Sequence, residues 1–312
     1  MKLKYIILSA VISLLIWSIL FIFVLKKELT VGLYRELFEL KTAHAEKSSS
    51  PRFFILAGSN GLYSHDAETF EKILNMPSTN LSVAVMFPLN YLLERYQTLL
   101  QSGDIVYLPL EYVNYTGKHS GGSFGDIYDI TIEKNFSKLT LKRFYNCFSR
   151  FDIPTLIESL AEQMLVTAGF KPLVTARSLT SYGDRAVNTP EEAGSYLDFI
   201  NSVPPAKVEF IEADPAIKEL LTWAANKNIS VIGGLPTTFD DTTILPEAKS
   251  SIEKLFTNNR ALFITAENCS LYPRKDFFDT SYHLQRQAQI KHSQIIAGEM
   301  LKKHPDLFRK VK

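Results

Sequence analysis

The longest apolar stretch of the chain lies near its N-terminus. The residues from Tyr5 to Leu25 include no charged side chain, and Lys26 and Lys27 follow them. About 20 apolar residues in a helix cross a hydrocarbon core of about 30 Å. A cleavable signal peptide has a shorter apolar region, of about 7–15 residues, that ends in small residues. This stretch ends in Phe-Val-Leu-Lys-Lys instead, so we predict an uncleaved membrane anchor over residues 1–27.

The charges around this stretch bear on its orientation. Lys2, Lys4 and the terminal amino group precede it, which favours a cytoplasmic N-terminus weakly, because basic residues also follow it. No later stretch is apolar and long enough to span again. We expect a single-pass protein of the inner (cytoplasmic) membrane, with an amphipathic stalk over residues 28–51 and an extracytoplasmic, periplasmic domain over residues 52–312.

Beyond the stalk, short apolar runs alternate with segments of helical spacing. Such alternation predicts an α/β domain with a mostly parallel sheet covered by helices. Residues 112–129 are rich in Gly, Ser and Asn and are expected to form a loop, and residues 180–205 an irregular insertion over one face of the sheet. The expected strands are 53–57, 80–87, 105–110, 229–235 and 261–265, and the expected helices 67–76, 89–100, 153–168, 216–227, 252–256 and 285–303.

Composition narrows the class of function. The 312 residues are 46% hydrophobic and 21% charged, which is typical of a globular protein. A formal net charge of +1 gives no basic excess for nucleic-acid binding. Two cysteines, Cys147 and Cys269, are too few for a structural zinc site, although an extracytoplasmic domain allows them to form a disulfide. No motif for a metal or an organic cofactor is found, so we expect neither.

Ser59 is the first candidate for chemistry. It follows the first expected strand, between Gly58 and Gly61, and ligands bind outside the carboxyl ends of parallel strands. A serine at a sharp turn in this place is suited to be a nucleophile. A plain helix N-cap is the competing interpretation, and the local sequence alone favours it.

A carboxylate and an imidazole stand near the other end of the chain. Asp279 and His283 lie four residues apart, just before the last expected helix. A serine nucleophile needs a base, and the base needs an orienting carboxylate. The other histidines lack such a partner in the sequence, so Ser59, Asp279 and His283 are the candidate catalytic residues.

Three segments together resemble the SGNH hydrolase superfamily: Gly58-Ser-Asn60, GDIVYLPLEY from Gly103 and FFDTSYHL from Phe277. They are most similar to its membrane-anchored bacterial members, which are associated with surface-polysaccharide O-acylation. The resemblance implies a three-layer, flavodoxin-like α/β/α domain. It also implies that Ser59 is the nucleophile, His283 the general base and Asp279 the residue that orients it.

The sequence departs from the superfamily pattern in three places. The spacing is Asp-x-x-x-His rather than Asp-x-x-His, the second block (Asn80-Leu-Ser-Val-Ala-Val) has no glycine, and the third strand ends without an asparagine. The oxyanion hole therefore needs other donors. The candidates for this role and for lining the pocket are Asn60, Ser82, Glu111, Tyr112 and Asp184, with Asn114 as a further donor.

The first functional hypothesis is a serine acyltransferase or esterase that acts on a cell-envelope polysaccharide, with O-acetylation as the expected reaction. The resemblance implies a multi-span membrane partner that delivers the acyl donor. The alternative is a non-catalytic glycan-binding or scaffolding subunit of a polysaccharide assembly complex. A third hypothesis, a lipid or thioester hydrolase at the membrane surface, predicts a broad apolar channel beside Ser59.

Overall fold

The computed structural model describes residues 2–24, 29, 33–117, 124–133, 140–148, 152–170 and 176–309. The chain divides into two compact units. We call Met1–Glu36 with Gly121–Ala176 the anchor unit, and Leu37–Ser120 with Arg177–Lys312 the α/β unit.

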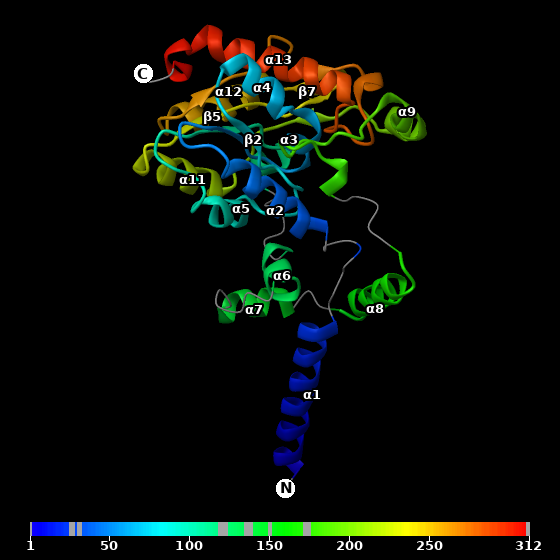
Figure 1. Ribbon diagram of the computed structural model, residues 1–312. Coiled ribbons are helices and arrows are strands. Elements are labelled where there is room, and N and C mark those ends of the chain that lie inside the picture. Colours follow the sequence, from blue (N-terminus) through cyan, green and yellow to red (C-terminus); the bar gives the residue numbers. More distant parts are fainter. Residues whose placement is uncertain are drawn as a thin grey trace. The chain divides into compact units, whose positions relative to one another are not determined.

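A five-stranded, all-parallel sheet forms the centre of the α/β unit (Figure 1). The strand order is β2-β1-β3-β5-β8, which matches the flavodoxin-like doubly wound sheets. The predicted α/β class with a parallel sheet is therefore confirmed. The strands are β1 (Phe53–Ile55), β2 (Ser78–Asn80), β3 (Ile105–Leu108), β5 (Ser230–Gly233) and β8 (Leu262–Phe263).

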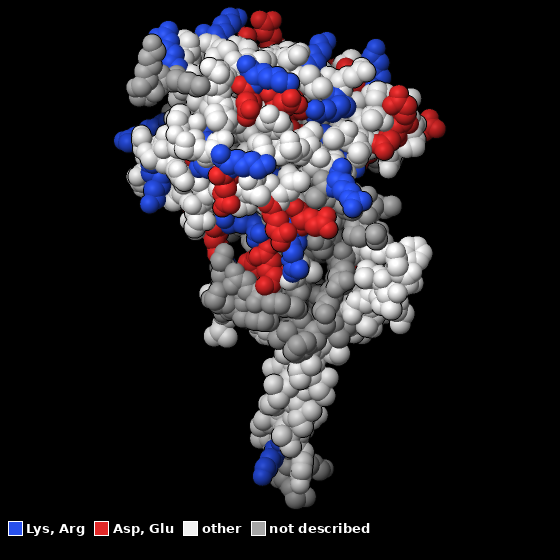
Figure 2. Space-filling view, in the orientation of Figure 1, with Lys and Arg blue, Asp and Glu red and all other residues white. Residues whose placement is uncertain are grey.

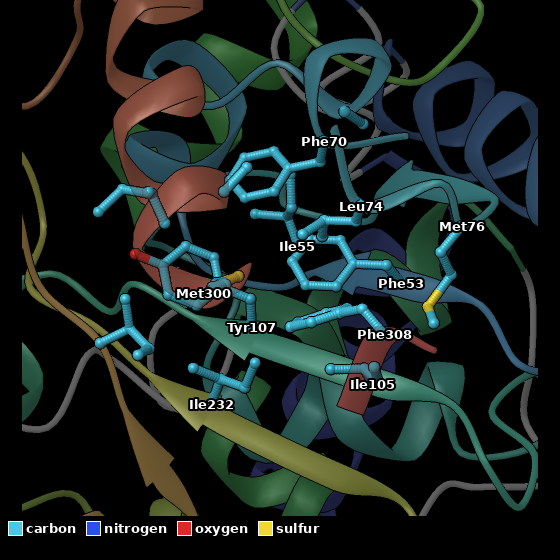
Figure 3. Close-up of a cluster of buried hydrophobic side chains, with 14 of the residues drawn as sticks. Phe53, Ile55, Phe70, Leu74, Met76, Ile105, Tyr107, Ile232, Met300 and Phe308 are labelled. Carbon is cyan, nitrogen blue, oxygen red and sulfur yellow. The ribbon is translucent and has the colours of Figure 1, made fainter. Parts of the chain in front are cut away.

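Helices cover both faces of this sheet. On one face, α4 (Ala67–Leu74) and α13 (Arg286–Lys303) pack over a cluster of buried side chains from β1, β3 and β5 (Figure 3). Ile232 belongs to that cluster, and because strand residues alternate in direction, Gly233 faces the other way. There a Cβ on Gly233 would lie 2.5 Å from the ring of Phe256. This second face carries α5 (Leu89–Tyr96), α11 (Pro215–Asn226) and α12 (Pro246–Thr257).

Local sequence explains where several helices begin. The side chain of Asp66 accepts from the amide of Thr69 at the start of α4, and Asp214 accepts from Ala216 at the start of α11, which has proline in its first turn. Both are favoured N-cap arrangements. The shorter elements of the α/β unit are α3 (Ser59–Ser64), α9 (Pro190–Ala193), α10 (Leu197–Ser202), β4 (Lys207–Val208) paired with β7 (Thr243–Ile244), β6 (Thr238–Phe239) paired with β9 (Leu271–Tyr272), and the 3-10 helices Tyr112–Tyr115, Ala176–Ser178, Gly194–Tyr196, Arg274–Asp276 and Pro305–Phe308.

Several predicted elements differ from the structure. The irregular insertion expected over residues 180–205 contains the short helices α9 and α10. The strand expected over residues 80–87 lies earlier, because β2 ends at Asn80. Beyond it the amides of Leu81 and Val83 still donate to the carbonyls of Ile55 and Ala57, at 2.8 and 3.4 Å. The amide of Ala57, however, donates to the Ser82 hydroxyl, which in turn donates to the carbonyl of Ile55. The loop expected over residues 112–129 contains the start of α6 (Phe124–Thr131).

The segment expected to be a stalk contains α2 (Leu33–Ala45), whose second half belongs to the α/β unit. Leu37 and Phe38 are fully buried. The buried ammonium of Lys41 donates to the carbonyls of Asn80 and Gly183, at 2.7 and 2.6 Å. Residues 37–45 are therefore a packed part of this unit.

The described residues of the anchor unit are mostly helical. They form α1 (Lys2–Val24), α6, α7 (Leu141–Phe148) and α8 (Ile153–Thr167). Within α1, Leu3–Leu20 has a mean hydropathy of 2.2, and none of this window is buried. Among the described residues this is the one helix that is long and apolar enough to cross a membrane, a property that membrane anchors and signal sequences share.

Candidate active site

The candidate site lies where the strand order of the sheet reverses. The chain leaves β1 toward β2 on one side and returns to β3 on the other, and ligands of such sheets bind at this switch point. Ser59 follows β1 as the first residue of α3, and Glu111 follows β3. The fold therefore brings these two residues to the same end of adjacent strands.

Glu111 binds the backbone on both sides of Ser59. Its buried carboxylate accepts from the amides of Gly58 and Asn60, at 3.2 and 2.9 Å. Burial raises the pKa of Glu111, and these amides together with the charge of His283 oppose that rise. A Cβ on residue 58 would lie 2.4 Å from Oε1 of Glu111, so glycine is required at this position.

Asp279 and His283 form a close pair. Nδ1 of His283 lies 2.5 Å from Oδ1 of Asp279, and their side chains are 12% and 25% exposed. The amide of Phe278 donates to the carbonyl of His283 at 2.7 Å and closes the loop between them. The extra residue of the Asp-x-x-x-His spacing is thus absorbed without separating the carboxylate from the imidazole.

Tyr63 connects this pair to the helix that begins with Ser59. Its ring stacks on the His283 ring, with 4.0 Å between centroids and an interplanar angle of 7°. Residues 59 and 63 are four apart in α3 and so share one face of it. The hydroxyl of Ser64 also donates to the carbonyl of Tyr282 at 2.7 Å. His283 is therefore held beside α3, whose first residue is the half-buried Ser59, and no hydrogen bond joins the described residues Ser59 and His283 in this structure.

Asn60 and Ser82 use their polar groups within the protein. The Asn60 side chain donates to the carbonyl of Pro109 at 2.8 Å and accepts from the amide and hydroxyl of Thr237. The Ser82 hydroxyl accepts from the amide of Ala57 and donates to the carbonyl of Ile55, and the backbone amide of Ser82 donates to Oδ1 of Asn80. Both residues support the turn around Ser59, and their side chains are bound to the backbone or to Thr237 rather than directed at Ser59.

Tyr112 and Asp184 are both buried. Burial, with Tyr282 nearby, raises the pKa of Tyr112 well above its usual value. Asp184 accepts from the amide of Ala67 and the side chain of Asn80, at 3.0 and 2.9 Å. Burial first, and then the charge of Asp66, raise the pKa of Asp184 to about 6. Asp184 thus belongs to a buried polar network between α4 and β2.

The structure adds residues that the sequence analysis did not single out. Tyr63 stacks on His283, and the guanidinium of Arg185 lies 5.5 Å from the centre of the Tyr63 ring. The Ser64 hydroxyl donates to the carbonyl of Tyr282, and the Thr237 hydroxyl lies 2.8 Å from that of Ser64, so that both residues support the loop before His283. Tyr63 could have been predicted from the sequence, because it lies four residues after Ser59 and so on the same face of a helix. The other contacts join segments far apart in the chain.

Metal binding and cysteine chemistry have less support than serine chemistry. Among the described residues no group of three or more His, Cys, Asp or Glu side chains is placed to hold a metal ion. Cys269 is a free thiol with the ammonium of Lys249 at 3.3 Å, and the Cys147 side chain lies outside the described residues. One polar cavity of about 220 Å³ is lined by Arg52, Arg95 and their neighbours and contains none of the candidate catalytic residues.

A comparison with protein-family models finds no match for this chain. A comparison with curated proteins finds none either. Function is therefore inferred from the fold and from the contacts around Ser59.

Proposed function

We propose that this protein is a membrane-anchored serine acyltransferase or esterase that modifies a cell-envelope polysaccharide, with acetyl as the transferred group. The observation that carries the proposal is the Asp279–His283 pair, which is stacked on Tyr63 one helical turn from Ser59. The resemblance to membrane-anchored SGNH proteins supports the glycan acceptor, the extracytoplasmic side and a multi-span partner that supplies the acyl donor.

Each residue has a defined role in this reaction. An ionised Asp279 accepts from Nδ1–H of His283, which leaves Nε2 free to accept a proton. Nε2 removes the hydroxyl proton of Ser59 as Oγ attacks the acyl carbonyl, and the same proton passes to the leaving group when the donor bond breaks. A sugar hydroxyl then attacks the acyl-serine, His283 takes its proton, and Ser59 is released with that proton restored. With water as acceptor the same steps give hydrolysis.

The test uses the full chain in lipid nanodiscs, because residues 37–45 are packed into the α/β unit. Release of p-nitrophenol from p-nitrophenyl acetate is measured for the wild type and for Ser59→Ala, His283→Ala and Asp279→Asn. We expect each to lose at least about 100-fold in rate. Ser202→Ala, at an exposed hydroxyl in α10, is the matched control and should retain wild-type activity.

A second readout tests Ser59 without any acceptor. An alkyl fluorophosphonate should phosphonylate Oγ of Ser59 with loss of fluoride, and His283→Ala should slow this labelling. Mass spectrometry locates the adduct. If the wild type neither hydrolyses the ester nor forms the adduct, the enzymatic proposal is wrong.

One observation favours the non-catalytic alternative. An oxyanion hole needs N–H donors aimed at the reacting oxygen, whereas the amides of Gly58 and Asn60 donate to Glu111 and the Asn60 side chain donates to Pro109. A glycan-binding or scaffolding subunit would bind envelope glycan with the same affinity in the wild type and in Ser59→Ala. It would also leave Ser59 unlabelled by the fluorophosphonate.

A further inference from the structure

Helix α8 of the anchor unit carries its apolar residues outward. Ile153, Ile157 and Met164 are 64%, 60% and 72% exposed, and Leu160 is exposed between them. These four positions recur at helical spacing and form one narrow stripe. An uninterrupted stripe of this kind on a water-soluble protein normally faces the core.

The opposite side of α8 is polar and less exposed. Ser159 is buried, and Thr155, Glu162 and Gln163 are each shielded more than the apolar stripe. The Ser159 hydroxyl donates to the carbonyl of Thr155 at 2.8 Å, and the Gln163 side chain donates to the carbonyl of Ser159 at 3.2 Å. The helix is therefore inverted relative to the usual arrangement in water.

The polar side of α8 connects it to the apolar helix α1. The two helices are in contact within the anchor unit. The amide of Leu29, shortly after the end of α1, donates to Oε2 of Glu162 at 3.1 Å. This hydrogen bond places α8 beside the point where the chain leaves α1.

The surface of α8 also has few charges. Its exposed positions include one charged residue, Glu158, and the side of α8 seen in Figure 2 is white, whereas the α/β unit in the same view carries both signs of charge. Leu141 and Tyr145 of α7 are exposed apolar residues in the same unit. Exposed apolar residues are thus found on α7 and α8 as well as on α1.

We propose that the Ile153–Ile157–Leu160–Met164 stripe of α8 lies in the membrane surface beside α1, with lipid acyl chains as its occupant. A helix with one apolar face lies in the interface with that face about 5–10 Å into the headgroup and acyl boundary. Lipid is the occupant because α8 contacts α1, whose apolar window Leu3–Leu20 is itself unburied. The proposal rests on α1 being inserted in a bilayer and is independent of the acyl-transfer chemistry.

The test uses spin labels on the full chain in nanodiscs of phosphatidylethanolamine and phosphatidylglycerol. The background is Cys147→Ser with Cys269→Ser, and single labels are placed by Ile157→Cys and Met164→Cys. Leu8→Cys in α1 is the lipid control and Lys218→Cys, at an exposed position of α11, is the water control. Power saturation measures collisions of each label with oxygen, which partitions into lipid, and with a water-soluble nickel chelate.

We expect the ratio of oxygen to nickel collisions at residues 157 and 164 to approach that at residue 8 and to exceed that at residue 218, because the stripe lies among acyl chains. If the collision ratio at residues 157 and 164 equals that at residue 218, the apolar stripe of α8 faces water. Few collisions with either reagent would show a protein contact, from a second copy or another chain. A water-like value at residue 8 would show that α1 is not inserted. Each of these three results overturns the proposal, whatever the outcome of fluorophosphonate labelling.

Discussion

The two units of this protein arrange the same kinds of side chain in opposite ways. In the α/β unit, Phe53 and Tyr107 are fully buried in the core (Figure 3), and the buried ammonium of Lys41 has backbone carbonyls as partners. In the anchor unit, Ile157 and Met164 are exposed while the neutral side chain of Ser159 is buried. The first arrangement is suited to water on all sides, and the second to an apolar surrounding along α8.

Two glycines give the sharpest comparison of packing between the units. Gly183 in the α/β unit and Gly169 in the anchor unit have φ values of +92° and +89°. A Cβ on Gly183 would lie 2.6 Å from the carbonyl oxygen of Asn80, whereas nothing lies within 4 Å of one on Gly169. Left-handed backbone costs a non-glycine residue about 1–2 kcal/mol, and Gly183→Ala adds a clash.

We therefore expect Gly183→Ala to lower the free energy of unfolding by about 3 kcal/mol and Gly169→Ala by about 1 kcal/mol. Hydrogen exchange on the full chain reports the two units separately. The effect of each substitution should be confined to its own unit. Equal losses at the two positions would contradict the crowding that we describe around Gly183.

The two units also differ in their histidine content. The sequence places no histidine in the anchor unit. The α/β unit buries His65 and His292, with ring centroids 4.9 Å apart. Burial lowers the pKa of His65 to about 3, and burial together with His65 lowers that of His292 well below its usual value. Both rings are neutral in the folded protein at neutral pH.

Because the unfolded chain binds these protons near pH 6.5, the contribution of the two histidines to the stability of the α/β unit should be complete above that pH. This contribution should fall by about 1.4 kcal/mol per pH unit for each histidine as the pH falls from about 6.5 toward about 3, whereas the raised pKa of Asp184 acts in the opposite direction below about 6. This slope is measured by denaturant unfolding at several pH values, with hydrogen exchange in the α/β unit as the readout. His65→Phe should reduce this slope by about 1.4 kcal/mol per pH unit, the value for one proton. An unchanged slope would show that His65 is not its source.

The sequence predicted most of the sheet, because strands buried on both faces appear as continuous apolar runs. The runs at 53–57, 105–110 and 229–235 contain β1, β3 and β5. The run at 80–87 gave a wrong strand boundary, because its Val and Met residues follow the strand, which ends at Asn80. The amide of Ala57 donates to the Ser82 hydroxyl instead of to a backbone carbonyl, and the hydrophobic pattern does not predict such a bond. Similarly, no pattern shows that Lys41 binds carbonyls 39 and 142 residues away.

The candidate site was predictable to the same limited extent. Asp279 and His283 are four residues apart, so the sequence alone suggested their contact, and the structure places their atoms 2.5 Å apart. Glu111 was chosen for its strand end, but its bonds to the amides beside Ser59 depend on the adjacency of β1 and β3. Sequence spacing thus identifies local pairs, and sheet topology decides which pairs meet.

The last comparison concerns two helix caps, of which the one in the anchor unit has the smallest expected effect. Asp152 caps α8 through the amide of Thr155 at 2.9 Å, as Asp66 caps α4 through Thr69 at the same distance. Asp66 is buried and also pairs with Arg286 at 2.6 Å, whereas Asp152 is exposed. Losing an N-cap costs about 1 kcal/mol, and losing one partner of a buried ion pair costs more.

Asp152→Ala should therefore raise exchange in the first turn of α8 by less than tenfold, which corresponds to about 1 kcal/mol. Asp66→Ala should destabilise the whole α/β unit by about 3 kcal/mol. Asp152→Asn, which retains the capping oxygen, is the matched control. The exchange is measured in nanodiscs and again in detergent. If lipid covers the apolar stripe, the Asp152→Ala effect should be smaller in the bilayer, since bound lipid holds α8 in its helical form. An equal effect in both media would argue that the cap alone maintains the helix.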